Sequence, residues 1–338
     1  MRLIFFSFRA NYRKMMFNNF LCNKVYGKYV VINLGGPFKH YIAKFLIFLG
    51  IGRGISCDGD PLILKISKGI NFWSRNSLHI PEEEKKLNNC FTAIRNNHIV
   101  QNDIFQLYPI KSLKSELTTN PKIIFISRID INTTPEEKKI WDKNKEQLLK
   151  NFDLIDDVNY WSQNILNSKD EMKKYTLYVK LKLLLRFEIV KSLKNRFGDQ
   201  MQIIGNDWKE FSFQSLPSPA IGSKEYNVKD IYNIYKGNIC LDLGSLVGSI
   251  SLYHRSIQII EAGGLIIQSK QHDSKKLWGD LYGKLIFNNI NDATNLIERL
   301  LNDQDFSSSL TNKIYNKFNK PEDLIEKSLD RVFNRITF

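Results

Sequence analysis

The sequence predicts an α/β protein with two domains, each built on a parallel sheet covered by helices, and three observations support this. Strand and helix patterns alternate over residues 1–110, a polar run follows at Lys111–Pro121, and at least four β-α units come after it. The chain has 338 residues, of which 43% are hydrophobic, so it can form two hydrophobic cores. We expect a first domain at 1–115, a clearer second domain at 122–320 and a terminal helix at 321–338.

The first domain opens with two short apolar stretches, Arg2–Ser7 and Tyr29–Leu34, that favour strands. The second stretch ends in Gly35-Gly36-Pro37, which is a turn signal. An apolar helix is expected at His40–Gly52. Another helix is expected to begin at Pro81, because proline suits the first turn and the glutamates after it interact favourably with the helix dipole. This alternation predicts a small α/β domain.

The second domain begins with the apolar run Lys122–Ile131, which predicts a buried strand. A capped helix start follows at Thr133–Glu137. The charged stretch that comes next interrupts the α/β alternation, and we interpret 134–167 as a helical insertion. A long helix is expected at Lys169–Arg196, because its second half has leucine and isoleucine at helical spacing, and a strand is expected at Met201–Ile204.

The most informative stretch of the chain is Asn238–Lys270. It predicts a buried strand, a loop of small residues, a helix, a pair of glycines that close the helix, and a second strand: Ile239–Leu241, Gly244–Ser249, Ser251–Ala262, Gly263–Gly264 and Leu265–Ile267. This is a βαβ unit whose loop lies at the carboxyl end of the first strand, where open α/β sheets bind their ligands. Backbone N–H groups at a helix start attract phosphate, so the loop is a candidate phosphate site.

The net charge of the chain is +14, and it is unevenly distributed. Residues 1–120 hold 17 Lys and Arg against 7 Asp and Glu, a difference of +10, whereas the remaining residues hold 49−17=32 against 35−7=28, a difference of +4. A basic first domain suits an anionic surface, either membrane headgroups or nucleic acid. A general bias of the composition towards Lys and Asn is the alternative explanation for the total charge.

The cysteines and histidines indicate neither a disulfide framework nor a metal site. The four cysteines are far apart in the sequence, and the five histidines are scattered. We therefore expect a cytoplasmic protein without a bound metal. No run of about 18 apolar residues is present, so a spanning helix is not expected. The start of the chain lacks the order of a signal peptide.

The order of several motifs after residue 122 resembles a known family. The motifs are a strand followed by an arginine, R-F-E-I-V near the end of a helix, I-I-G-N-D-W, H-R-S-I followed by A-G-G-L-I-I, and N-x-x-D-A-x-x-L-I-E-R-L-L-N-D. This order resembles the carboxyl domain of GT-B glycosyltransferases of the group 1-like and CgeB-type kinds. The likeness covers residues 122–320, and over residues 1–120 it is only architectural.

The resemblance implies two Rossmann-like domains that face each other across a cleft, with the donor, a nucleoside-diphosphate sugar, bound by the second domain and the acceptor by the first. An acceptor hydroxyl would attack the anomeric carbon, and the nucleoside diphosphate would leave. The acceptor would be a glycan, a lipid-linked molecule or a protein in cell-surface polysaccharide synthesis. No redox cofactor is implied, and the family often works without a metal. Such a site needs positive charge and N–H donors at the diphosphate.

The resemblance also indicates which residues would hold the donor. Three arginines would stabilise the diphosphate, and the loop and helix start of the βαβ unit would contact the phosphates or the sugar: Arg128, Arg186 and Arg255, then Gly244, Ser245, Gly248, Ser249 and Ser251. The turn at Gly205 and Asn206 would hold the base, with Trp208 beside it, although an ordinary turn with a core tryptophan is equally open. Asp242, inside a strand, is expected to pair with Arg255, because an unpaired buried carboxylate is costly.

One position departs from the family pattern. A glutamate is expected five residues before the glycine of the A-x-G turn, where it would hold the donor ribose, but Gln258 stands there. Glutamine can still form hydrogen bonds with a ribose but carries no charge. Glu261 lies three positions further along, so either residue is a candidate for this contact.

Two residues of the first domain are candidates for the catalytic base. His40 follows the glycine turn and can act as a general base on the acceptor, and Asp58 belongs to an Asp-Gly-Asp-Pro cluster. For both, a structural role is the alternative, in the case of Asp58 as a turn-forming residue. The apolar helix at 38–48 suits an enzyme at the inner membrane face, but core packing is favoured. The rival function is a non-catalytic protein, a degenerate transferase, that binds nucleic acid or a partner; we favour the transferase and expect no nucleic acid.

Overall fold

The structure of the chain is a computed structural model that describes a large part of its residues. These are residues 2–8, 24–33, 39–57, 69–73, 90–92, 110–127, 129, 131–166, 170–205, 208, 215–216, 228–244, 246, 251–271, 273–320, 323, 325–327 and 329–330. The chain divides into two compact units. Unit 1 combines Met1–Lys111 with Asn319–Phe338, and unit 2 is Ser112–Phe318.

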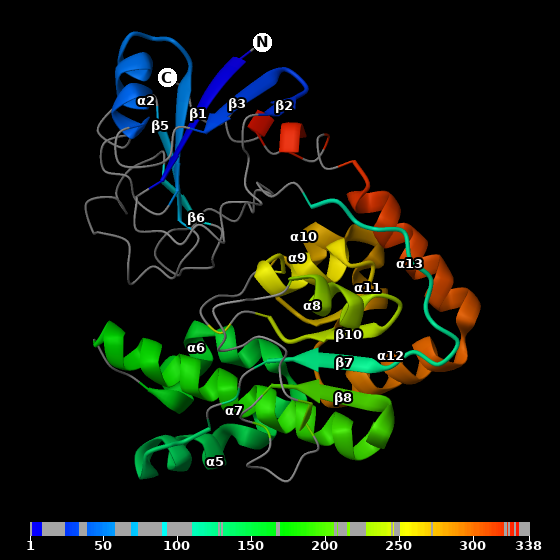
Figure 1. Cartoon of the computed structure of the whole chain (residues 1–338). Coiled ribbons are helices and arrows are strands. Elements are labelled where there is room, and N and C mark those ends of the chain that lie inside the picture. Colours follow the sequence, from blue (N-terminus) through cyan, green and yellow to red (C-terminus); the bar gives the residue numbers. More distant parts are fainter. Residues whose placement is uncertain are drawn as a thin grey trace. The chain divides into compact units, whose positions relative to one another are not determined.

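Unit 1 contains a six-stranded sheet with the order β2-β3-β1-β4-β5-β6 (Figure 1). Its strands are β1 (Arg2–Phe8), β2 (Lys24–Tyr26), β3 (Tyr29–Asn33), β4 (Arg53–Cys57), β5 (Gly69–Trp73) and β6 (Cys90–Thr92). The short β2 pairs antiparallel with β3, and the other pairs are parallel. Without β2, the order is that of a flavodoxin-like doubly wound sheet. Unit 1 is therefore a Rossmann-like α/β unit, as predicted.

Unit 2 contains a second six-stranded sheet, with the order β12-β11-β10-β7-β8-β9. Its strands are β7 (Ile123–Ile126), β8 (Met201–Ile204), β9 (Ser215–Leu216), β10 (Ile239–Asp242), β11 (Leu265–Ser269) and β12 (Ile286–Phe287). All neighbouring pairs are parallel. Numbered within the unit, this is the order of the Rossmann fold, which changes direction between the first and fourth strands, β7 and β10. The predicted α/β class is confirmed in both units.

The helices of unit 2 cover this sheet (Figure 1). They are α5 (Pro135–Lys150), α6 (Val158–Tyr160), α7 (Glu171–Phe197), α8 (Val228–Tyr235), α9 (His254–Glu261), α10 (Ser274–Trp278), α11 (Tyr282–Leu285), α12 (Ile290–Asn302) and α13 (Gln304–Phe318). Short 3-10 turns lie at η2 (Phe152–Asp156), η4 (Gly198–Gln200) and η6 (Gly279–Leu281), and a π-helical turn at η3 (Trp161–Ile165). The four residues of β7 and the four of β10 are all buried, as expected for central strands.

Local sequence signals explain where two of these helices begin and end. At the start of α5, the Thr134 hydroxyl accepts from the Glu137 N–H, and the Glu137 carboxylate accepts from the Thr134 N–H. At the end of α9, the Gly263 N–H donates to the Ile260 carbonyl and the Gly264 N–H to that of Ile259, which is a Schellman motif. Gly263 has φ +74°, so the predicted left-handed glycine cap is confirmed.

The start of α9 differs from the prediction. The helix begins at His254 and not at Ser251, because the backbone before it is held by another segment. The Ser251 N–H donates to Asp273 Oδ1 at 2.7 Å, and the Ser251 hydroxyl lies 2.9 Å from the Ser274 hydroxyl. These contacts keep residues 251–253 out of the helix.

The end of the chain packs on unit 1. The Glu326 carboxylate accepts from the Lys28 N–H, and the Asp330 carboxylate accepts from the Tyr29 hydroxyl at 2.5 Å and pairs with the Lys28 ammonium at 2.7 Å. Burial and this hydrogen bond raise the pKa of Tyr29 to about 12. Gly27 has φ +56°, and a Cβ atom there would lie 2.0 Å from the Glu326 carboxylate, so this hairpin turn favours glycine.

Helix α2 (Lys39–Phe48) packs beside β1 and β4, and it corrects one expectation. Leu46 is partly buried against Phe5. Tyr41, Phe45 and Phe48, in contrast, are 58%, 60% and 78% exposed. The favoured core packing therefore holds for only one side of α2, because only part of its apolar surface contacts the sheet.

Candidate functional site

A cavity of about 220 Å³ lies at the carboxyl ends of β7 and β10, where the strand order of unit 2 changes direction. Open α/β sheets bind their ligands at this point. The lining residues come from the ends of the two strands, from α7, and from the segment that leads into α9: Phe125, Ile126, Ser127, Arg186, Leu241, Leu243, Gly244, Leu246, Tyr253 and Arg255. None of these described residues carries a carboxylate.

Arg186 projects from α7 into this cavity and is 8% exposed. Its Nη1 donates to the Ser127 hydroxyl at 3.0 Å, and its Nη2 donates to the Gly244 carbonyl at 2.8 Å. Its Nε is buried and has no hydrogen-bond partner among the described residues. Burial lowers the pKa of Arg186, and Arg255 adds to the effect, whereas Tyr253 and Asp242 oppose it. A buried cation with a spare donor is costly unless an anion approaches it.

Arg255 is the second arginine of the cavity and lies in the first turn of α9. Its Nη1 donates to the Tyr235 hydroxyl, on α8, at 3.3 Å. Burial raises the pKa of Tyr235, so this phenol stays protonated at neutral pH. The two guanidinium groups come from distant positions in the sequence, and the fold brings them to one cavity.

The Asp242 carboxylate, at the end of β10, is 1% exposed and accepts four hydrogen bonds. Oδ1 accepts from the Gly244 N–H at 2.9 Å and from the Tyr253 hydroxyl at 2.6 Å. Oδ2 accepts from Ser256 Oγ at 2.8 Å and from Gln268 Nε2 at 2.7 Å. Asp242 therefore has the expected structural role, but neutral donors rather than Arg255 supply its four hydrogen bonds. Burial and the nearby Asp242 raise the pKa of Tyr253 well above its usual range.

Gly244 connects the strand, the arginine and the cavity. Its N–H donates to Asp242 and its carbonyl accepts from Arg186. Its φ is +73°, and an added Cβ would lie 2.4 Å from Gln271 Nε2. Both facts favour glycine at this position, because other residues rarely adopt this conformation. The backbone at Gly244 thus meets the cavity without a side chain in between.

The turn after β8 has a packing role. An added Cβ at Gly205 would lie 2.1 Å from the Ser127 carbonyl oxygen. Trp208 is fully buried, donates from Nε1 to that carbonyl at 2.8 Å, and stacks on Phe187 with an interplanar angle of 15°. The core interpretation of Trp208 is confirmed, and its buried ring offers no surface to a base held at this turn.

Three other predicted donor contacts do not line this cavity. Ser251 is fully buried, with its hydroxyl on Ser274, and Gln258 is 3% exposed within the core. Glu261 accepts a short hydrogen bond from the Tyr232 hydroxyl, and burial raises the pKa of its carboxyl group. For the two residues on α9, the direction in which each side chain points explains this: Arg255 faces the cavity, whereas Gln258 and Glu261 face the core and α8.

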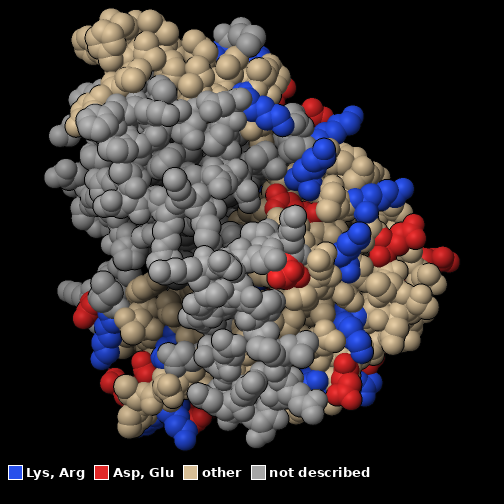
Figure 2. Space-filling view, viewed as in Figure 1, with Lys and Arg blue, Asp and Glu red and all other residues tan. Residues whose placement is uncertain are grey.

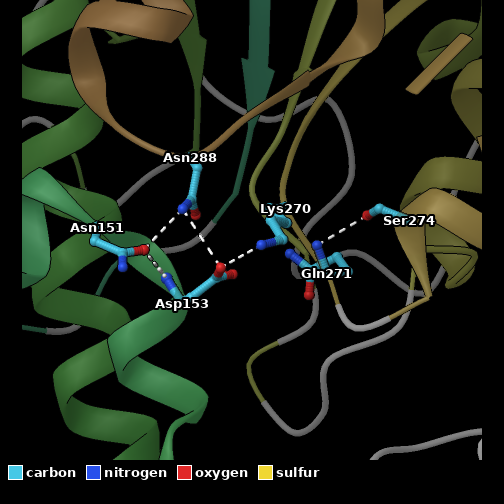
Figure 3. Close-up of polar contacts among 6 residues, drawn as sticks. All are labelled: Asn151, Asp153, Lys270, Gln271, Ser274 and Asn288. Atoms are coloured by element: carbon cyan, nitrogen blue, oxygen red, sulfur yellow. Dashed lines mark hydrogen bonds and ion pairs between the residues drawn. The ribbon is translucent and has the colours of Figure 1, made fainter. Parts of the chain in front are cut away.

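A second polar cluster lies at the ends of β11 and β12 (Figure 3). The Lys270 ammonium pairs with the Asp153 carboxylate, which raises the pKa of Lys270. Asn288 Nδ2 donates to Asn151 Oδ1 at 2.7 Å, and the Gln271 N–H donates to the Ser274 hydroxyl at 2.8 Å. These contacts tie η2 to the sheet edge, so we regard the cluster as structural.

A small cavity of about 30 Å³ lies between this cluster and α7. Arg186 also lines it, together with Lys182, Lys270 and Gln271. Burial lowers the pKa of Lys182, while Asp156 opposes the shift. The volume suits about one or two water molecules.

Several predicted site residues lie outside the described residues: Asp58, Arg128, Asn206, Ser245, Gly248 and Ser249. The backbone of His40 belongs to α2, and its side chain is not among those described. Within the part of the chain that the structure describes, no group of three or more His, Cys, Asp or Glu side chains could hold a metal ion. No helix of that part is both long and apolar enough to cross a bilayer.

Sequence reasoning missed the two polar residues Ser127 and Tyr253 of the cavity. Ser127 directly follows β7, and Tyr253 directly precedes α9. Positions just after a strand or just before a helix in a βαβ unit face the ligand edge of the sheet, and that rule could have found both. Lys182 was missed as well, although it lies one helical turn before Arg186 and thus on the same side of α7.

The comparisons with known proteins show no family for this chain. No family model matches it, and no curated protein matches it. A solved structure described as "OtsA apo structure" is similar at 10% sequence identity and a TM-score of 0.44, with all of both chains covered. The α/β class of the two units therefore rests on the strand orders of their sheets.

Proposed function

We propose that the chain is a glycosyltransferase that binds a nucleoside-diphosphate sugar, with the diphosphate in the cavity between the ends of β7 and β10. The observation that carries this proposal is Arg186, a buried arginine with a spare donor on the cavity wall. Arg255 lines the same cavity. The donor sugar is a substrate, so the proposal includes no cofactor.

The charge of the cavity favours a phosphorylated ligand. Two guanidinium groups line it, and none of the described lining residues is acidic, so the cavity attracts an anion. Guanidinium groups match the geometry of phosphate oxygens, and their attraction is stronger in a buried site than in water. The N–H of Gly244 is already bonded to Asp242, so among the described lining residues the arginines are the main donors.

The size and position of the cavity also fit. A cavity of about 150 Å³ in another protein holds a benzene ring. A cavity of about 220 Å³ therefore accommodates a diphosphate or one sugar ring, although not a whole nucleotide sugar. Its position at the change in strand order is where doubly wound sheets bind nucleotides. An elongated nucleic acid would instead need an extended open surface.

The proposed reaction uses the arginines to stabilise the leaving group. The acceptor oxygen forms a bond to the anomeric carbon while the bond from that carbon to the phosphate oxygen breaks. Negative charge develops on the departing diphosphate, where Arg186 and Arg255 offset it. The proton of the acceptor hydroxyl passes to a base, for which His40 and Asp58 are the candidates. The acceptor is proposed to be a glycan, a lipid-linked molecule or a protein of surface polysaccharide synthesis.

The test is thermal unfolding in the presence of uridine, guanosine, adenosine and cytidine diphosphates and their sugars. A ligand of the folded state raises the Tm, so one of these nucleotides is expected to stabilise the protein. Arg255→Ala should abolish the shift without changing the Tm of the free protein by much. Arg196→Ala removes the same charge from an exposed residue paired with Glu298, so it is the matched control and should keep the shift.

Either of two results would contradict the proposal. One is that no nucleoside diphosphate or nucleotide sugar changes the Tm. The other is that Arg255→Ala binds as tightly as the unchanged protein. If the protein instead binds single-stranded RNA with an affinity that falls steeply with salt, the rival function as a non-catalytic binding protein replaces this one.

A further inference from the structure

Helix α2 and the turn after it carry an exposed apolar surface. Six large apolar side chains there are between 44% and 78% exposed, and we call them the α2 surface: Tyr41, Ile42, Phe45, Phe48, Leu49 and Ile51. Single exposed apolar residues are normal, but a contiguous group of this kind marks an interaction site. At the place of α2, the described residues are tan in Figure 2, with no Asp or Glu among them.

The helical residues of this surface lie on one face. At 100° per residue, positions 41, 42, 45 and 48 fall within about 120° of the helix circumference. Leu46, which follows Phe45, lies beyond one edge of this arc and packs against Phe5 of the sheet. The helix is thus anchored to unit 1 by one side and presents two phenylalanines and a tyrosine on another.

All Lys, Arg, Asp and Glu residues in the sequence around α2, residues 1–57, are positively charged. Residues 1–57 contain nine Lys and Arg and no Asp or Glu, so this segment has a formal charge of +9. Two of these residues, Lys39 and Lys44, belong to α2 itself. An apolar helix face within a segment of this charge is the combination that binds anionic lipid bilayers.

We propose that the α2 surface docks unit 1 on an anionic lipid membrane, with α2 lying in the plane of the headgroups. The helix has 10 residues, whereas about 20 are needed to cross the hydrocarbon core, so it lies on the bilayer. Phe45 and Phe48 enter the boundary between headgroups and acyl chains, and Tyr41 places its hydroxyl at the headgroups. The lysines and arginines contact lipid phosphates.

A second copy of the chain fits this surface less well. A symmetric dimer would bring the same surface together twice, and with it two segments that each carry a charge of +9. Like charges at this density repel each other at physiological salt. An anionic membrane covers the apolar side chains and also neutralises the charge.

The test is sedimentation of the full chain with vesicles of phosphatidylcholine alone and with vesicles of equal parts phosphatidylcholine and phosphatidylglycerol. We expect binding to the anionic vesicles that weakens as salt is raised. The double variant Phe45→Ser with Phe48→Ser should bind roughly tenfold or more weakly, because the affinity scales with buried apolar area. Leu113→Ser is the control, since Leu113 is also an exposed apolar residue, at 51%, but belongs to unit 2.

Circular dichroism and the Tm should be the same for the double variant as for the unchanged protein, because these side chains are exposed. Three results would overturn the proposal: no binding to anionic vesicles, equal binding to neutral vesicles, or unchanged binding of the double variant. Loss of a dimer in the double variant by light scattering, without membrane binding, would assign the surface to a second copy. Nucleotide binding is measured separately, so the proposed function can fail or hold independently of this result.

Discussion

The cavity of unit 2 and the α2 surface of unit 1 are opposite in character. In the cavity wall, an arginine is buried and a carboxylate next to it accepts four hydrogen bonds. On α2, phenylalanine side chains are more than half exposed. Folding alone favours neither arrangement, since it buries apolar groups and exposes charges. The comparison teaches that the best candidates for function are the places where polarity and burial disagree.

The largest effect is expected from removing the buried carboxylate of Asp242, next to the cavity. Asp242→Ala leaves four donors without their acceptor, from Gly244, Tyr253, Ser256 and Gln268. We expect the free energy of unfolding to fall by about 3–5 kcal/mol, as for removal of one partner from a buried charged network. Denaturant unfolding measures this. Asp305→Ala, at an exposed position of α13, should change it by less than about 0.5 kcal/mol, and equal losses for the two variants would contradict the account.

The next prediction concerns the backbone conformation at Gly244, in the wall of the cavity. Gly244→Ala places a Cβ at φ +73° and 2.4 Å from Gln271 Nε2, so we expect a loss of about 1–2 kcal/mol from the conformation alone. Gly283→Ala is the matched control, because a Cβ there meets nothing within 4 Å. Thermal and denaturant unfolding of both variants check this prediction. If Gly244→Ala leaves the free energy of unfolding unchanged, the turn rearranges freely and the prediction is wrong.

A smaller effect depends on pH. Burial raises the pKa of Asp273 to about 6, although hydrogen bonds from Ser251 lower it. The folded state therefore binds a proton more tightly than the unfolded state, and ionisation of Asp273 destabilises the fold. Compared with Asp273→Asn, the unchanged protein should gain about 1 kcal/mol of stability as the pH falls from 7 to 5. Denaturant unfolding of both proteins at each pH checks this; a constant difference between them would show an unperturbed carboxyl group.

The last prediction is that removal of metal ions has no effect on nucleotide binding. Because two arginines supply the positive charge in the proposed site, a chelator such as EDTA should leave the nucleotide-induced rise in Tm unchanged. Added magnesium should change it little. A rise in Tm that disappears with EDTA and returns with magnesium would show that a metal ion takes part in holding the diphosphate.

Much of the fold of unit 2 was predictable from local sequence. The Thr134 capping box, the glycine cap of α9 and the central strands β7 and β10 depend on residues within a few positions of one another. The start of α9 was not predictable in this way. It depends on Asp273 and Ser274, more than twenty residues away, which hold Ser251 outside the helix.

The site was predictable only in part, for a similar reason. The resemblance pointed to Arg186 and Arg255, and both line the cavity. It also pointed to Gln258, which lies in the core because the rotation of α9 is set by packing over the whole helix. An apolar helix such as α2 does not reveal in its sequence which of its faces the sheet covers, so its exposed side required the structure.

The central claim is that the buried Arg186 and the half-buried Arg255 bind a diphosphate, and calorimetric titration of nucleoside diphosphates into Arg186→Gln tests it most directly. Glutamine keeps a donor for Ser127 or Gly244 but removes the charge and the spare Nε donor. Loss of a charged hydrogen bond lowers affinity by about 1.5–3 kcal/mol, or roughly tenfold to a hundredfold. The account predicts this loss with the fold retained by circular dichroism; unchanged affinity in a folded variant would contradict it.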